Sequence, residues 1–167
     1  MLPNIFEHSE LVARVALFLG RALNENGSVL NLKLVQAGAL LHDITKTRSI
    51  QTRERHDATG EQLLREMGYP EVAYIVGLHV HLADEPLKTA FVTEAELVYY
   101  SDKRVKHSLL VSLEERYRDL LERYAHTPAH IRLLSSNHTV SREVERRVFT
   151  GLDLNPEDLK ERLYETP

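Results

Sequence analysis

The sequence contains no cysteine among its 167 residues. Disulfide bonds and thiolate metal sites are therefore excluded, and any bound metal would have to be held by imidazole and carboxylate side chains. No apolar run approaches the roughly 20 residues that a membrane-spanning helix needs. The N-terminus also lacks the charged-then-apolar order of a signal peptide. We therefore expect a cytoplasmic protein that does not act at a membrane.

The chain has no strong excess of charge of either sign, and its formal net charge is −4 at pH 7. This value disfavours a dedicated nucleic-acid-binding protein, because such proteins present a basic surface to the phosphates. We therefore expect no nucleic-acid partner. A length of 167 residues is sufficient to bury one hydrophobic core without disulfides, which favours a single domain.

Strand-like alternation is absent as well, and apolar residues recur at helical spacing almost throughout the chain. The spacing predicts helices over residues 6–23, 32–45, 56–67 and 71–79. Thr93 and Glu96 form a capping box that begins another helix, and Pro128 and Pro156 divide the C-terminal part into further helices. Residues 46–55 are polar without periodicity, which predicts a loop. The fold class is predicted to be all-α.

His42 and Asp43 stand side by side at the end of the helix predicted over residues 32–45. That helix is apolar almost all round, which favours a central, buried position. Ionisable groups on an apolar helix need compensation for their desolvation, and a bound cation supplies it directly. Adjacent residues lie about 100° apart around a helix, so both can reach one metal ion only if other elements supply further ligands.

Candidate ligands do lie at the ends of other predicted helices. His8 shares the apolar face of the first helix, because it precedes Leu11 and Val12 by three and four residues. The remaining candidates are His56, His79, His81 and Asp102. The sequence therefore predicts a metal site gathered from several helices.

The order of His8, the His42-Asp43 doublet and Asp102 resembles the HD superfamily of metal-dependent phosphohydrolases. The resemblance extends from about His8 to Arg104. It implies a single HD-type helical bundle, with the metal-binding phosphohydrolase domain over residues 1–110. Residues 111–167 are then expected to form a helical extension packed on the same domain, as a lid, a dimer surface or additional core.

The histidines between the doublet and Asp102 resemble the two-metal branch of this superfamily, which cleaves dinucleoside polyphosphates or cyclic dinucleotides. That resemblance implies one metal ion held by His8, His42, Asp43 and Asp102, and a second that Asp43 shares with His56 and His79. The ions implied are divalent Fe, Mn, Co, Ni or Zn, because imidazole and carboxylate ligands favour these over Mg.

The resemblance also implies a reaction. Metal-activated water would cleave a phosphoester or phosphoanhydride bond of a small nucleotide-like substrate. Asp43 would bridge the two ions. Lys46 follows the doublet at the family's spacing and would stabilise charge on the phosphate oxygens.

Three further residues are candidates for substrate contact: His81, Arg53 and Arg104. The two arginines flank the doublet and Asp102, and guanidinium groups bind phosphate in a bidentate manner. The aromatic and aliphatic stripe from Tyr99 to Tyr117 is expected to be core or dimer contact, so a homodimer is one expectation.

Two alternative functions stay open at this stage. One is a di-iron oxygenase of the same superfamily, which would use the same ligands to activate dioxygen. The other is a non-catalytic module that retains the metal for ligand sensing or as a scaffold.

Overall fold

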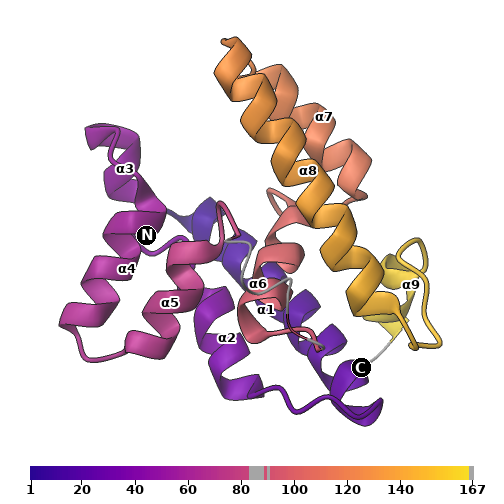
Figure 1. Cartoon of the computed structure of the whole chain (residues 1–167). Helices are drawn as coiled ribbons and strands as arrows, with labels where there is room; N and C mark the ends of the chain where they lie inside the picture. Colours follow the sequence, from indigo (N-terminus) through magenta and orange to yellow (C-terminus); the bar gives the residue numbers. More distant parts are fainter. Residues whose placement is uncertain (83–88, 90, 166–167) are drawn as a thin grey trace.

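The computed structural model describes residues 1–82, 89 and 91–165. Over these residues the chain forms a helical bundle with one short hairpin of two-residue strands (Figure 1). The elements are α1 (Pro3–Glu25), α2 (Leu32–Leu41), α3 (Lys46–Thr52), α4 (His56–Glu66), α5 (Pro70–Leu78), α6 (Glu94–Lys103), β1 (Val105–Lys106), β2 (Leu109–Leu110), α7 (Leu113–Tyr124), α8 (Pro128–Phe149) and α9 (Leu159–Glu165). The prediction of an all-α fold is confirmed.

Local sequence signals begin the helices that carry the site. The Asn31 side chain accepts hydrogen bonds from the backbone N–H groups of Lys33 and Leu34, each at 3.2 Å, and so caps α2. Thr93 and Glu96 form the predicted reciprocal capping box at the start of α6. Each cap satisfies donors that a helix leaves unpaired at its N-terminus.

Two predictions about the segment around the doublet are wrong. Residues 46–55 are not all loop, because α3 covers Lys46–Thr52 and ends where Arg53 adopts φ 61°. This short helix has no buried face, so it leaves no apolar periodicity to detect. The preceding helix ends at Leu41, and residues 42–45 form turns that join α2 to α3.

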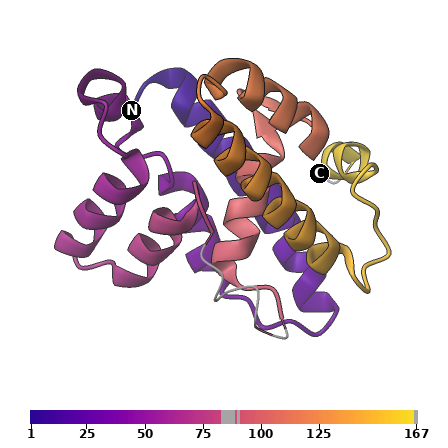
Figure 2. The same cartoon turned by 45° about the horizontal axis from the view of Figure 1, so that its top comes forward.

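The central helix is α6 rather than α2, which corrects a further prediction. Every residue from Ala95 to Lys103 is buried, whereas in α2 only Val35, Gly38 and Ala39 are. Helix α6 contacts α1, α2, α5 and α8, which surround it (Figure 2). The apolar composition of α2 predicted a central helix, but the other helices pack around α6, so α6 takes the central position.

A close approach of α2 and α5 depends on Gly38. A Cβ atom at this position would lie 2.6 Å from Cγ2 of Ile75 on α5, which is closer than real Cβ contacts. Glycine therefore allows the two helices to pack tightly. The C-terminal ends of α2 and α5 carry His42 and His79, so this contact sets the spacing of the site.

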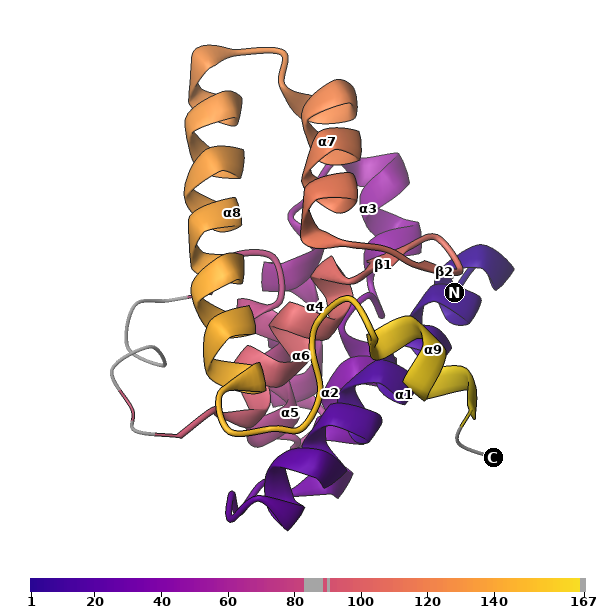
Figure 3. The same cartoon turned by 90° about the vertical axis from the view of Figure 1, so that its right-hand side faces the viewer.

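The C-terminal segment shares the hydrophobic core of the rest of the chain. Helices α7 and α8 lie side by side, and α9 lies beside α1, where the Arg14 guanidinium lies over the Tyr164 ring (Figure 3). Val144, Val148 and Leu159 are fully buried in the same cluster as the residues of α1 and α6. Tyr99 and Tyr117 are buried too, as core residues. Within the described residues, no helix combines the length and the apolar character required to cross a membrane.

Candidate metal centre

Six predicted ligand residues lie together at the ends of helices that are far apart in the sequence. They are His8 on α1, His42 and Asp43 after α2, His56 at the start of α4, His79 directly after α5, and Asp102 near the end of α6. Five of them are buried, with exposed fractions of 7% or less, and His56 is half-buried. The bundle thus collects imidazole and carboxylate groups in a largely dry position.

The first group of donor atoms surrounds Asp102. Its Oδ1 atom lies 3.0 Å from Nε2 of His8 and 3.7 Å from Nε2 of His42. Nε2 of His42 lies 3.4 Å from Oδ2 of Asp43. Two ligands of one transition metal ion, each about 2.0–2.2 Å from it, lie roughly 3 Å apart, so these separations suit a common ion.

The second group surrounds the other oxygen of Asp43. Oδ1 of Asp43 lies 3.3 Å from Nε2 of His56 and 3.5 Å from Nε2 of His79. The two Nε2 atoms are 3.1 Å apart. Asp43 therefore lies between the two groups, with Oδ2 directed to His42 and Oδ1 to His56 and His79.

Three of the histidines are held in the same orientation by hydrogen bonds to backbone carbonyls. Nδ1–H of His42 donates to the Ala39 carbonyl at 2.7 Å, and that of His79 donates to the Val76 carbonyl at 2.6 Å. Nδ1 of His8 likewise lies 3.0 Å from the His107 carbonyl. In the neutral form each ring therefore carries its proton on Nδ1 and directs an unprotonated Nε2 to the cluster, as metal-ligating histidines do.

Two atoms of the doublet have no hydrogen-bond partner although they are buried. They are Nε2 of His42 and Oδ1 of Asp43, in residues with exposed fractions of 0% and 1%. An unpaired buried polar atom is costly, because it has lost its contacts with water. A divalent transition metal ion would satisfy both atoms, so the residues present fit such an ion.

Both carboxylates are ionised despite their burial. Burial raises the pKa of Asp43, but its contacts with His42, His56 and His79 outweigh this effect and hold the pKa well below its usual range. Burial likewise raises the pKa of Asp102, and the Lys103 ammonium together with His8 and His42 lowers it well below the usual value. Negative charge is therefore available to a cation throughout the neutral pH range.

The two most buried histidines differ in their titration. Burial lowers the pKa of His79 to about 4, so its ring is neutral near pH 7 and ready to act as a ligand. Burial also lowers the pKa of His42, but the charges of Asp43 and Asp102 outweigh it and raise the pKa. A metal ion at His42 must therefore compete with a proton that the two carboxylates stabilise.

Each carboxylate also accepts a hydrogen bond from a lysine ammonium at its Oδ2 atom. The Lys46 ammonium donates to Oδ2 of Asp43 at 2.7 Å, and its side chain is 39% exposed. The Lys103 ammonium is buried and donates to Oδ2 of Asp102 at 2.6 Å and to the His79 carbonyl at 2.8 Å. Sequence reasoning did not single out Lys103 among the neighbouring cations, because its contact with the His79 carbonyl joins residues 24 positions apart.

The predicted substrate contacts are placed differently from one another. Arg53 is exposed at the end of α3, and His81 is exposed two residues after His79. Arg104 is buried, with an exposed fraction of 4%.

The Arg104 guanidinium is occupied by contacts within the fold. It donates to the carbonyls of Val111 at 2.7 Å and Pro156 at 2.9 Å, and it pairs with Tyr100 and Glu145. These contacts fasten α6 to the C-terminal segment. These contacts and its burial give Arg104 a role in the fold, and phosphate binding by this residue stays a prediction.

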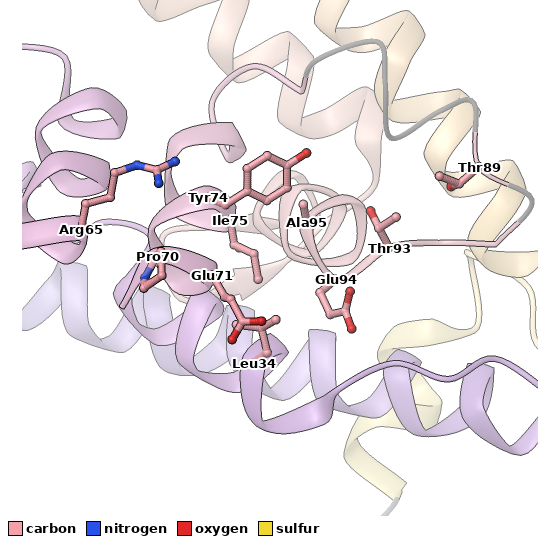
Figure 4. Close-up of a pocket in the computed structure, with 10 residues that line it drawn as sticks. All are labelled: Leu34, Arg65, Pro70, Glu71, Tyr74, Ile75, Thr89, Thr93, Glu94 and Ala95. Atoms are coloured by element: carbon pink, nitrogen blue, oxygen red, sulfur yellow. The ribbon is translucent and has the colours of Figure 1, made fainter. Parts of the chain in front are cut away.

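A separate pocket of about 590 Å³ is lined by residues of α2, α4, α5 and α6 (Figure 4). Its walls include Leu34, Tyr74 and Ile75, with Arg65 and Glu94 at its polar edges. Tyr74 lies at the middle of α5 and Glu94 begins α6, whereas His79 directly follows α5 and Asp102 lies near the end of α6. The pocket is therefore not the site that the ligands form.

Comparison with known proteins places these residues in a family context. Residues 5–113 match the HD domain family, and this range contains all six ligand candidates. The chain is 35% identical over 78 residues to the uncharacterized protein MJ0778 of Methanocaldococcus jannaschii, covering 46% of this chain and 45% of that protein. It is 29% identical over 121 residues to ribonuclease Y of Desulfotalea psychrophila, covering 70% of this chain and 22% of that protein. The chain thus spans less than half the length of each relative. No solved structure matches it.

Proposed function

Because the chain belongs to the HD domain family, we propose that it is a metal-dependent phosphohydrolase acting on a phosphoester or phosphoanhydride bond of a small nucleotide-like substrate. The observation that carries this proposal is the pair of donor groups that share Asp43, each within reach of one ion. Family membership by itself implies metal-dependent phosphohydrolase chemistry, and the donor groups supply the means in this chain.

We further propose that two ions bind, of the kinds Fe, Mn, Co, Ni or Zn. His8, His42 and Asp102 would hold the first with one oxygen of Asp43, and His56 and His79 would hold the second with the other oxygen. This arrangement supports a place in the two-metal branch of the superfamily. Such ions polarise a phosphoryl oxygen and lower the pKa of a bound water molecule.

The chain's own residues would orient the substrate and carry its charge. The Lys46 side chain is partly exposed beside Asp43, so its ammonium can reach a non-bridging phosphate oxygen. The carboxylates of Asp43 and Asp102 stay fixed because Lys46 and Lys103 hold one oxygen of each. Burial of the cluster limits access of bulk water and strengthens these electrostatic interactions.

The substrate class is proposed from the chemistry and from one relative. A protein named ribonuclease Y acts on RNA, whose links are phosphodiesters, and it resembles 70% of this chain. This similarity supports a phosphodiester among the substrates. The net charge of −4 favours a small nucleotide over a long nucleic acid.

The proposal is tested with purified protein loaded with manganese and assayed anaerobically. The panel contains bis-p-nitrophenyl phosphate, a dinucleoside tetraphosphate, a cyclic dinucleotide and a short RNA. We expect hydrolysis of at least one, lost in Asp43→Ala and kept in Asp153→Ala, which removes an exposed carboxylate elsewhere. Product release without dioxygen would exclude the oxygenase alternative. If the fully metal-loaded protein hydrolyses no substrate of the panel, the result favours a non-catalytic module.

A further inference from the structure

Helix α8 contacts the segment that follows His79 through one buried side chain. Asn137, with an exposed fraction of 6%, lies near the middle of α8. Its Oδ1 atom accepts a hydrogen bond from Nδ1–H of His81 at 2.8 Å. Its Nδ2 atom donates to the Val80 carbonyl at 3.3 Å. One amide thus contacts the two residues that directly follow the predicted ligand His79.

The two contacts together determine which atom of each group carries hydrogen. The Val80 carbonyl only accepts, so the amide must present its NH₂ group there. Oδ1 of Asn137 is then left for His81, and a carbonyl oxygen can pair only with a protonated ring nitrogen. The neutral His81 ring therefore carries its proton on Nδ1 and leaves Nε2 as an acceptor.

The same orientation is seen in the neighbouring histidines, with one difference. His8, His42 and His79 donate from Nδ1 to backbone carbonyls within residues 1–110. His81 donates to a side chain of α8, which lies outside residues 5–113 that match the family. The C-terminal segment therefore contributes a hydrogen bond to His81 from outside the range that matches the family.

Asn137 is itself fixed by the helix that carries Asp102. Tyr99 on α6 donates its hydroxyl to the Asn137 carbonyl at 3.1 Å. The Lys103 ammonium, which binds Asp102, lies 4.9 Å from the centroid of the Tyr99 ring. Both the side chain and the backbone of Asn137 therefore contact elements that carry or directly follow predicted ligands. These contacts fix the position of α8 relative to the metal centre.

We infer that Asn137 is a positioning residue that holds His81 with Nε2 as a hydrogen-bond acceptor for the substrate. An acceptor at Nε2 suits a donor such as a sugar hydroxyl, whereas a phosphate oxygen of a diester carries no proton to donate. This inference rests on the proposed function, and it makes a hydroxyl group of the substrate the expected partner of His81.

The first test measures the tautomer directly, in protein loaded with diamagnetic zinc. Long-range ¹⁵N–¹H correlation spectra report which ring nitrogen is protonated, and the His81 signal is the one lost in His81→Gln. We expect Nδ1–H in the wild-type protein and in Asn137→Asp, which keeps an acceptor oxygen. Asn137→Leu should show Nε2–H or a mixture, while Thr139→Ala, an exposed change on the same helix, should match the wild type. Nε2–H in the wild type, or unchanged Nδ1–H in Asn137→Leu, overturns the inference.

The second test compares two phosphodiesters at full metal loading. Adenylyl-(3′→5′)-adenosine carries sugar hydroxyls, and bis-p-nitrophenyl phosphate carries none. Asn137→Leu should raise KM for the dinucleotide about fivefold, with kcat within about twofold, because one neutral hydrogen bond is lost. Kinetics with the second probe should change less than about twofold. Equal losses with both probes, or reduced metal content, would show a merely structural role. If the wild type cleaves neither probe, the proposed function fails for diesters, and the tautomer still decides the role of Asn137.

Discussion

At the scale of single residues, Asp43 and Lys46 contact each other, but their substitution is expected to have different effects on metal content and on turnover. Asp43 has one oxygen on each donor group, so Asp43→Ala should reduce the bound metal and abolish turnover. Lys46 is no metal ligand, so Lys46→Ala should keep its metal and lower kcat roughly 100-fold through lost stabilisation of transition-state charge. Elemental analysis combined with kinetics measures both. Lys33→Ala, on the exposed side of α2, is the control. Equal metal loss in the Lys46 and Asp43 variants would contradict these roles.

The second donor group gives a prediction about the number of ions. His56 is half-buried at the start of α4, where it contributes Nε2 to Asp43 and His79. His56→Ala should therefore lower the metal content of fully loaded protein from about two ions per chain to about one. The helical circular dichroism signal should not change, and His130→Ala, on the exposed face of α8, should keep both ions. A wild-type value of one ion per chain would end the two-metal proposal.

At the scale of helices, the spacing between His42 and His79 depends on how closely α2 approaches α5. Gly38→Ala places a Cβ atom against Ile75, so the helices must move apart or the side chain must shift. We expect a loss of about 1–3 kcal/mol in the free energy of unfolding, typical of overpacking, together with weaker metal binding. Urea unfolding and metal titration measure the two effects. Gln36→Ala, on the exposed side of α2, should change neither.

The hairpin and α7 are joined by ion pairs that depend on pH. Burial raises the pKa of Asp119, but Arg123 and Lys106 outweigh it and hold the pKa below its usual value of 3.8. A carboxyl whose pKa is lower in the folded state stabilises the fold above the unfolded pKa, and this stabilisation is lost as the pH falls through the folded pKa. The stability difference between wild type and Asp119→Asn should therefore be full at neutral pH and shrink below about pH 3.8. Urea unfolding across this range measures it, with Glu122→Gln as a control on the same helix. A difference that grew in acid would contradict the ion-pair explanation.

At the scale of the whole molecule, metal binding should stabilise the fold. The cluster draws ligands from α1, α2, α4, α5 and α6, so an ion would join most of the bundle. A ligand present at 100 times its Kd adds about 2.7 kcal/mol. For a chain of this size, that corresponds to a rise in Tm of roughly 5–10 °C. Removal of metal by a chelator should lower Tm by this amount, and manganese or iron should restore it. An unchanged melting curve after verified removal would count against the entire site.

The sequence by itself determined the fold class and the chemical nature of the site. Helical periodicity and the capping boxes depend on residues within a few positions, so local pattern was sufficient to predict most helices. The absence of cysteine fixed imidazole and carboxylate as the available ligands. The resemblance to the HD superfamily supplied the residue order, and the family match agrees with it.

Only the tertiary structure decided which atoms meet. It directed the two oxygens of Asp43 to different histidines, buried Arg104 against the C-terminal segment, and brought Asn137 to His81. Contacts in the site join residues up to 99 positions apart, as between His8 and the His107 carbonyl. Their geometry depends on how tightly whole helices pack, for example at Gly38, and neither periodicity nor residue spacing along the chain contains that information.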